Sequence, residues 1–197
     1  MPPEILDVPA CLARVREGDE AAARLLVEHL YPLVIKIVRA HRPRRVAEED
    51  LAQEIYMKLF NRLEQYTGRD GTPFEHWVSR VAVTTCLDAL RAEQRRPEWR
   101  WADLGEGERA WVEFFTGTTP AEAPGDAAAA REATELLLSF LSAEDRLVLT
   151  LLDLEERPVA EISRLTGWGQ SAVKVRAFRA REKLRKHARQ LKKENQL

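Results

Sequence analysis

Residues 158–185 read PVAEISRLTGWGQSAVKVRAFRAREKLR, and they carry the strongest structural pattern in the chain. Pro158 suits the first position of a short helix. A turn with two glycines follows at 166–169, and Ser171 can begin a second, long basic helix. This order is typical of the helix-turn-helix motif, whose second helix enters the major groove of DNA. The pattern predicts DNA binding, with a helical hairpin that merely presents a solvated charged helix as the alternative.

Helical spacing divides this second helix, predicted over residues 171–190, into two faces. The residues predicted to pack against the rest of the motif are spaced four, three and four apart: Val173, Ala177, Ala180 and Leu184. Phe178 falls on the adjoining exposed, basic face, where an aromatic ring suits contact with a thymine methyl or a sugar. Arg176 and Arg181 are better placed for phosphates, which orient a protein on DNA without reading its sequence.

Helical spacing also dominates the N-terminal half of the chain. Asp19 can cap a helix over residues 20–42, which Pro32 is expected to bend or interrupt. A second helix is predicted over residues 47–64. Its apolar stripe recurs every four residues, at Leu51, Ile55, Leu59 and Leu63.

A loop with two glycines, residues 65–72, separates that helix from a third one. Thr72 can cap the third helix, Pro73 suits its first position, and Glu75 can complete a capping box. The helix turns basic towards its end, before Pro97 breaks it.

Residues 98–130 are predicted to be a linker, because glycine and proline recur there. The segment also holds aromatic side chains, namely Trp99, Trp101, Trp111, Phe114 and Phe115. They favour docking on the rest of the molecule, with docking on a partner as the alternative. Strand signals are scarce, so the sequence predicts an all-α fold: two small helical domains, residues 1–97 and 131–197, joined by this linker.

The charge is nearly balanced overall but unevenly distributed. The 197 residues hold 31 Lys and Arg against 32 Asp and Glu. Residues 103–161 carry fourteen acidic and four basic side chains, whereas residues 162–197 carry eleven basic and two acidic ones. This distribution indicates an anion-binding C-terminal end joined to acidic material.

Composition argues against several classes of protein. With 45% hydrophobic and 32% charged residues the chain can build a core, which excludes general disorder. Cys11 and Cys86 are too few for a disulfide framework or a thiolate metal site. No apolar run approaches the roughly 20 residues that span a membrane, and no signal peptide is evident at the start. We therefore expect a cytoplasmic protein without membrane insertion.

Motifs for catalysis are missing from the sequence. The four histidines lie far apart without metal-ligand spacing: His29, His41, His76 and His187. No glycine-rich phosphate loop and no nucleophile motif occurs. The sequence predicts no enzymatic activity, no metal and no cofactor.

Three segments match one family in order and spacing. Residues 50–60, DLAQEIYMKLF, resemble the polymerase-binding helix of bacterial sigma factors. Residues 74–91 look like the promoter-melting helix that follows it, and residues 141–185 look like the promoter-reading C-terminal domain. The chain thus resembles the extracytoplasmic-function (ECF) type of the sigma-70 family, which keeps only these two domains.

The resemblance implies a transcription initiation factor that binds core RNA polymerase and directs it to promoters. The positions that would face the clamp helices of the largest polymerase subunit are Asp50, Gln53 and Glu54. The loop at residues 66–72 would accept a base flipped out of the −10 element, with Tyr66 and Arg69 as candidates. The arginines that would follow the melted strand are Arg80, Arg91, Arg95 and Arg96.

The −35 element would be read by the second helix of the helix-turn-helix motif. The matching positions are Ser171, Lys174, Val175, Arg176, Phe178, Arg179 and Arg181. Three departures from the family put the promoter sequence in question. Thr84 stands where the family usually has Asn, Val175 stands where it has a small polar residue, and Trp168-Gly169-Gln170 replaces a plainer turn.

The implied partners are core RNA polymerase, promoter DNA and an anti-sigma protein. A helix-turn-helix regulator that binds DNA without polymerase is the alternative function.

Overall fold

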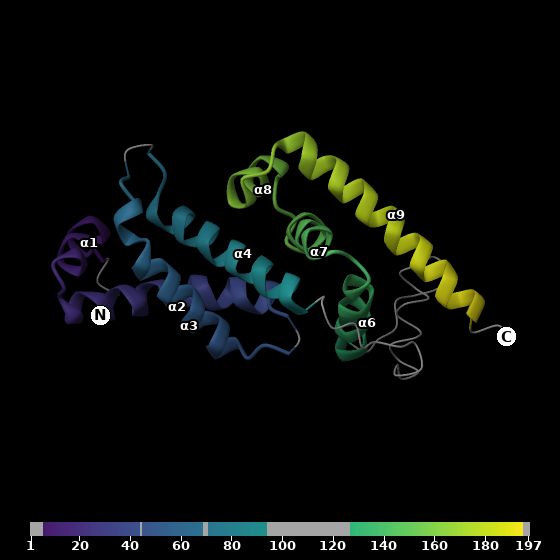
Figure 1. Ribbon diagram of the computed structural model, residues 1–197, viewed down its shortest axis with the longest axis horizontal. Coiled ribbons are helices and arrows are strands. Elements are labelled where there is room, and N and C mark those ends of the chain that lie inside the picture. The colour runs from purple at the N-terminus through teal and green to yellow at the C-terminus, as the bar shows by residue number, and fades with distance from the viewer. Residues whose placement is uncertain (1–5, 44, 69–70, 94–126, 195–197) are drawn as a thin grey trace. The chain divides into compact units, whose positions relative to one another are not determined.

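The structure is a computed structural model that describes residues 6–43, 45–68, 71–93 and 127–194 (Figure 1). These residues form helices and turns and contain no strand, so the expected all-α fold is confirmed. Most of the predicted linker lies outside the described residues. The last four residues of the predicted linker, 127–130, are described. They are helical and not linker, because α6 (Ala127–Ser139) begins at Ala127.

The chain divides into two compact units. Of the described residues, those up to 90 and residues 164–167 form the first unit, and residues 91–93, 127–163 and 168–194 form the second. Each helix is assigned below to the unit that holds most of its residues.

The first unit is a group of four α-helices and one short 3₁₀ turn. They are α1 (Val8–Arg16), α2 (Glu20–His41), α3 (Glu48–Asn61), η1 (Leu63–Gln65) and α4 (Phe74–Glu93). The sequence predicted α2, α3 and α4 to within a few residues at their described ends.

The first helix, α1, was not predicted. It begins where the Asp7 carboxylate accepts a hydrogen bond from the Ala10 backbone N–H at 3.1 Å, and Pro9 lies within its first turn. Cap and proline together favour a helix start. Cys11 and Leu12 are buried, so α1 is part of the core of this unit.

The second helix, α2, is capped as the sequence indicated. The Asp19 carboxylate accepts hydrogen bonds from the N–H groups of Ala21 and Ala22 at 2.9 and 3.1 Å. The expected interruption at Pro32 is wrong, because α2 continues through it to His41. Pro32 is exposed, where water can satisfy the carbonyl that loses its helical donor.

The core of the first unit lies between α2, α3 and α4. Its fully buried side chains, each 0% exposed, include Val34, Val38, Ile55, Val78, Ala82 and Cys86. Burial raises the pKa of the Cys86 thiol to about 12, so this cysteine stays neutral and unreactive at physiological pH.

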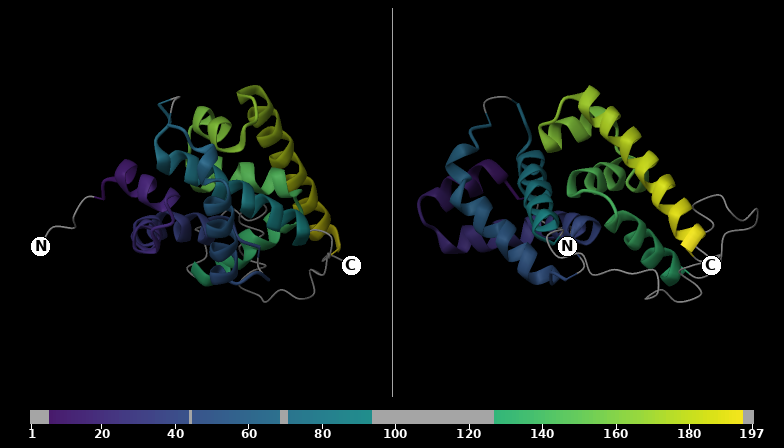
Figure 2. Two further views of the ribbon diagram at one scale, coloured as in Figure 1. Left: turned by 60° about the vertical axis from the view of Figure 1, so that its left-hand side comes forward. Right: turned by 45° about the vertical axis from the view of Figure 1, so that its right-hand side comes forward.

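The second unit contains the helix-turn-helix motif and two preceding helices. Its elements are α6, α7 (Ala143–Leu149), the π-helical turn η3 (Thr150–Leu154), α8 (Val159–Thr166) and α9 (Gln170–Glu194). Both views of Figure 2 show α9 as one long uninterrupted helix. It runs past the predicted end at residue 190.

The core of the second unit joins α7 to the inner face of α9. Side chains at 0% exposure include Leu147, Val148, Leu151, Ile162, Val173 and Ala180. Leu184 is half-buried and packs on a cluster from α6 that contains Ala133, Leu136 and Leu137. The predicted packing face of α9 is therefore confirmed.

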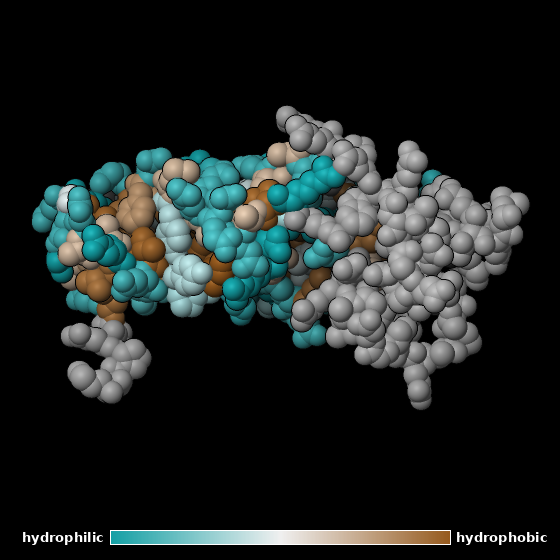
Figure 3. Space-filling view, turned by 90° about the horizontal axis from the view of Figure 1, so that it is seen from below, coloured by the Kyte–Doolittle hydropathy of each residue, from teal (hydrophilic) through white to brown (hydrophobic). Residues whose placement is uncertain are grey.

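The described surface is predominantly hydrophilic on the face drawn in Figure 3, with hydrophobic side chains scattered among the polar ones. Among the described helices, none has both the length and the apolar character needed to cross a membrane.

Candidate nucleic-acid interface

The outer face of α9 presents apolar side chains next to cations. Phe178 is 64% exposed and Val175 is 49% exposed, although both are large and hydrophobic. Ser171, Lys174 and Arg179 are exposed on the same side of the helix. An aromatic ring and a branched aliphatic side chain beside positive charges suit the edge of a DNA groove, where methyl groups and phosphates lie close together.

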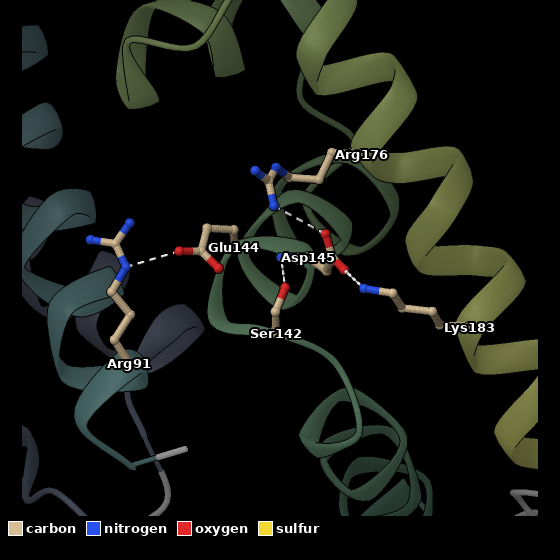
Figure 4. Close-up of polar contacts among 6 residues, drawn as sticks. All are labelled: Arg91, Ser142, Glu144, Asp145, Arg176 and Lys183. Atoms are coloured by element: carbon tan, nitrogen blue, oxygen red, sulfur yellow. Dashed lines mark hydrogen bonds and ion pairs between the residues drawn. The ribbon is translucent and has the colours of Figure 1, made fainter. Parts of the chain in front are cut away.

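The opposite side of α9 is fixed by a buried carboxylate. Asp145, in the first turn of α7, is 3% exposed. One of its oxygens lies 3.3 Å from Arg176 Nη1 and the other lies 2.6 Å from Lys183 Nζ (Figure 4). Arg176 and Lys183 are seven residues apart, which is two helical turns, so both point to the same side of α9.

Arg176 also has an aromatic neighbour. Its Cζ atom lies 4.9 Å from the centre of the Trp168 ring, in the arrangement of a cation–π contact. The Trp168 carbonyl accepts a hydrogen bond from Ser163 Oγ at 2.6 Å, which ties the turn to the end of α8. Arg176 is therefore held by a carboxylate and an indole at once.

Arg181 is paired in a similar way. Its Nε lies 3.1 Å from Asp153 Oδ2, and Nη2 donates a second hydrogen bond to the other oxygen of the same carboxylate. This pairing raises the pKa of the Arg181 guanidinium above its ordinary value.

The basic residues predicted to contact the −35 element thus fall into two groups. Arg176 and Arg181 have carboxylate partners within the second unit. Within the described part of the chain, Lys174 and Arg179 have no such partner and their side chains are available to a ligand. Sequence spacing could not make this distinction, because it does not show which acidic residue lies opposite each cation.

In the first unit, Tyr66 organises the predicted −10 loop. Its hydroxyl donates to the Thr72 carbonyl at 2.9 Å, and its ring contacts those of Phe74 and Trp77, with centroids 4.9 and 5.7 Å away. Gly71, at φ 65°, makes the turn possible, since this left-handed conformation favours glycine. Arg69 lies outside the described residues.

A cavity of about 470 Å³ opens beside this loop, between α1 and the start of α4. Tyr66, Phe74 and Leu12 line it together with two charged side chains, Arg16 and Glu75. Arg16 Nη2 donates to the Tyr66 carbonyl at 2.6 Å and to the Leu63 carbonyl at 3.2 Å, so it fixes the start of the loop. Arg16 is not among the residues predicted from the sequence. The signal that could have identified Arg16 is its place in the last turn of α1, a helix that Asp7 caps.

The remaining candidates for the melted strand lie along α4. Arg80 is exposed in the middle of the helix, and Thr84, one turn later, donates to the Arg80 carbonyl at 2.9 Å. Arg91 is exposed in the last turn. Arg95 and Arg96 lie outside the described residues.

The predicted polymerase-binding residues lie on one side of α3. Asp50 and Gln53 are exposed, and Glu54 is half-buried with its carboxylate 2.7 Å from Lys58 Nζ. Met57, which is 54% exposed, follows one turn after Gln53 and was missed as a candidate. A flexible apolar side chain beside carboxylates and amides is typical of a protein-binding surface.

No group of three His, Cys, Asp or Glu residues that could hold a metal ion occurs within residues 6–43, 45–68, 71–93 and 127–194.

Comparison with known proteins matches both units. The family model for sigma-70 region 2 matches residues 26–96, and the one for sigma-70 region 4 matches residues 131–184. The chain is 29% identical over 174 residues to the ECF RNA polymerase sigma-E factor of Escherichia coli (strain K12), covering 86% of this chain and 87% of that protein.

One further relative and one solved structure are also similar to this chain. The ECF RNA polymerase sigma factor ShbA of Streptomyces griseus is 29% identical over 188 residues, covering 93% of this chain and 96% of ShbA. The solved structure of CnrH in complex with the cytosolic domain of CnrY shares the fold, with a TM-score of 0.52 and 20% identity over 89% of this chain and 92% of that one. The chain therefore belongs to the sigma-70 family of RNA polymerase sigma factors and to its ECF type.

Proposed function

We propose that the chain is a transcription initiation factor that binds core RNA polymerase and brings it to promoters by reading −10 and −35 elements. The observation that carries this proposal is the outer face of α9. Phe178 and Val175 are exposed there at 64% and 49%, beside Lys174 and Arg179. Their exposure costs solubility without stabilising the fold, which favours a function in binding.

Reading of the −35 element is assigned to this face. Lys174 and Arg179 can donate to guanine edges or phosphates, and Phe178 and Val175 can contact thymine methyl groups. Ser171, at the start of α9, can donate or accept a hydrogen bond at a base edge. Contact of Arg176 and Arg181 with phosphates remains a prediction from the sequence, although each already has a carboxylate partner.

Reading of the −10 element is assigned to the loop after Tyr66 and the cavity beside it. The cavity volume of about 470 Å³ lies within the range of about 300–1,000 Å³ found for small-ligand pockets. A cavity of this size is large enough for a nucleobase. Aromatic rings supply stacking for a base taken out of the duplex. Residues predicted to hold the base or the strand backbone are Tyr66, Arg69, Arg80, Arg91, Arg95 and Arg96.

Binding of core polymerase is assigned to the exposed side of α3. Asp50, Gln53 and Glu54 offer acceptors for basic or polar side chains, and Met57 offers apolar area beside them. Such a factor needs no catalytic residue or cofactor of its own, because the polymerase performs the chemistry. It acts in the cytoplasm, where its polymerase is. The CnrH structure contains a second protein chain, and we extend this by analogy to an anti-sigma partner here.

The proposal is tested by removing two cations from α9. Lys174→Ala combined with Arg179→Ala should abolish transcription from a cognate promoter while core polymerase still copurifies with the factor. A matched control, Arg24→Ala with Lys36→Ala, removes the same charge from exposed positions on α2 and should retain activity. Promoter-directed transcription by the α9 variant would refute the −35 assignment. Failure of the wild-type chain to bind core polymerase would instead favour a regulator that works alone.

A further inference from the structure

Two carboxylates hold α9 at opposite edges of its buried face. Arg176 and Lys183 form one edge and pair with Asp145, and Arg181 forms the other edge and pairs with Asp153. At 100° per residue, Arg176 and Arg181 lie about 140° apart around the helix axis, with the buried alanines Ala177 and Ala180 between them. Ion pairs on both edges resist rotation of α9 about its own axis.

The two carboxylates differ in burial. The Asp145 side chain is 4% exposed, whereas that of Asp153 is 36% exposed. A buried carboxylate must have partners for both oxygens, because desolvation of an unpaired charge is costly. Arg176 and Lys183 provide these partners, so the Asp145 contact constrains α9 more strongly than the solvated Asp153 pair does.

The Asp145 side chain points towards α9 (Figure 4). Asp145 is the third residue of α7, where an acidic side chain often turns back to the N-cap residue. Here the Ser142 hydroxyl accepts a hydrogen bond from the Asp145 N–H at 3.3 Å, while the carboxylate oxygens contact the two cations on α9 (Figure 4).

Trp168 adds a third support to the same contact. Because the Arg176 guanidinium lies against its ring, the arginine connects α7, α9 and the turn that precedes α9. Trp168 belongs to the segment, residues 168–170, that differs from the plainer turn of the family, and no function is predicted for it from the sequence. Its contact with Arg176 supplies one.

We propose that Asp145 is a positioning residue for −35 recognition, and that Arg176 acts with it as a fixed support rather than as a contact to DNA. This inference rests on the proposed function. It explains why Arg176 and Lys183 of a strongly basic helix are paired with a buried carboxylate. The Asp145–Arg176–Trp168 contact sets the rotation of α9, and this rotation decides which base edges Lys174, Phe178 and Arg179 meet.

A small rotation is enough to matter. Side-chain ends lie about 6 Å from a helix axis, so a rotation of about 15° displaces them by roughly 1.6 Å. Hydrogen bonds to base edges tolerate only a few tenths of an ångström. Loss of the Asp145 contact should therefore reduce discrimination between DNA sequences more than it reduces general attraction to DNA.

The test compares holoenzymes assembled from core RNA polymerase and the full chain, wild type or variant. Affinity is measured for promoter fragments with the preferred −35 element and with a scrambled one, over a series of salt concentrations. For Asp145→Asn and for Arg176→Gln the ratio of the two affinities should fall about tenfold, the loss expected when one base pair is no longer read. The affinity ratio of the double variant should be no lower than that of either single variant, since both residues act through one contact.

Salt dependence separates the two possible roles of Arg176. A phosphate contact contributes about 0.9 to the slope of log affinity against log salt. Under the proposal the slope of Arg176→Gln equals that of wild type. Asp153→Asn is the matched control, because it removes the exposed pair on the other edge, and it should change the affinity ratio less than about twofold.

Three results would overturn the proposal. The first is an unchanged affinity ratio in Arg176→Gln, a variant that leaves Asp145 paired with Lys183 and so should remain folded. The second is a slope reduced by about 0.9 in that variant, which would assign Arg176 to a phosphate. The third is an unchanged ratio in a folded Asp145→Asn protein, as judged by circular dichroism. If the wild-type holoenzyme itself shows no −35 preference, the proposed function fails, and this inference fails with it.

Discussion

Replacing Phe178 by alanine should weaken promoter binding without weakening the fold. Complete burial of a phenylalanine side chain contributes about 1.5–3 kcal/mol. Since Phe178 is 64% exposed in the free protein, DNA can bury about two-thirds of it, which amounts to about 1–2 kcal/mol. This corresponds to a loss of about 5- to 25-fold in affinity for a cognate promoter.

Two measurements test this. Promoter affinity is determined by fluorescence anisotropy at saturating core polymerase, and the free energy of unfolding is determined by urea titration of the factor alone. Leu154→Ala is the matched control, because Leu154 is also large, apolar and exposed (57%) but lies in η3 rather than on α9. Its affinity should stay within about twofold of wild type, as expected for a surface substitution away from the DNA contact.

Val173→Ala gives the opposite pattern within the same helix. Val173 is 0% exposed, so its truncation should lower the free energy of unfolding by about 1–3 kcal/mol. If Phe178→Ala destabilises the fold to a similar extent, Phe178 has a structural role. If it leaves promoter affinity within twofold of wild type, DNA does not cover this side chain.

Three further predictions concern the first unit. Asp50→Arg should weaken core polymerase binding in a pull-down titration, since it reverses an exposed charge on α3, and unchanged affinity would remove this residue from the surface. Ile55→Ala, at a 0% exposed position, should lower the free energy of unfolding by about 2–5 kcal/mol in a urea titration. A cost below about 1 kcal/mol would contradict the core packing. Hydrogen bonds from the Ala22 N–H and Arg14 lower the pKa of Asp19, so its contribution to stability is present at neutral pH and is lost as acid protonates it. The stability difference between wild type and Asp19→Ala should therefore shrink below about pH 4, and a difference independent of pH down to 2 would contradict this.

Periodicity predicted the faces of α9 correctly. Val173, Ala177 and Ala180 recur at intervals that bring them to one side of a helix, and all three are buried. The same reasoning left Phe178 on the exposed side. Local spacing is sufficient here because a helix fixes the direction of each side chain relative to its neighbours.

Contacts between distant residues could not be predicted in this way. The sequence predicts a phosphate contact for Arg176, and it could not show that this side chain also pairs with Asp145, which is 31 residues away. In the first unit, α1 was missed because its nine residues are few and include a proline. The cavity beside Tyr66 depends on α1, so it was missed for the same reason.

The most direct measurement of the central claim is to sequence the 5′ ends of RNA made in vitro from genomic DNA by core polymerase, with and without this chain. We expect start sites that depend on the added factor and share two sequence elements, one for each DNA-binding surface. With the Lys174→Ala/Arg179→Ala variant, starts that depend on the upstream element should disappear. Identical start sites with and without the wild-type factor would contradict the account.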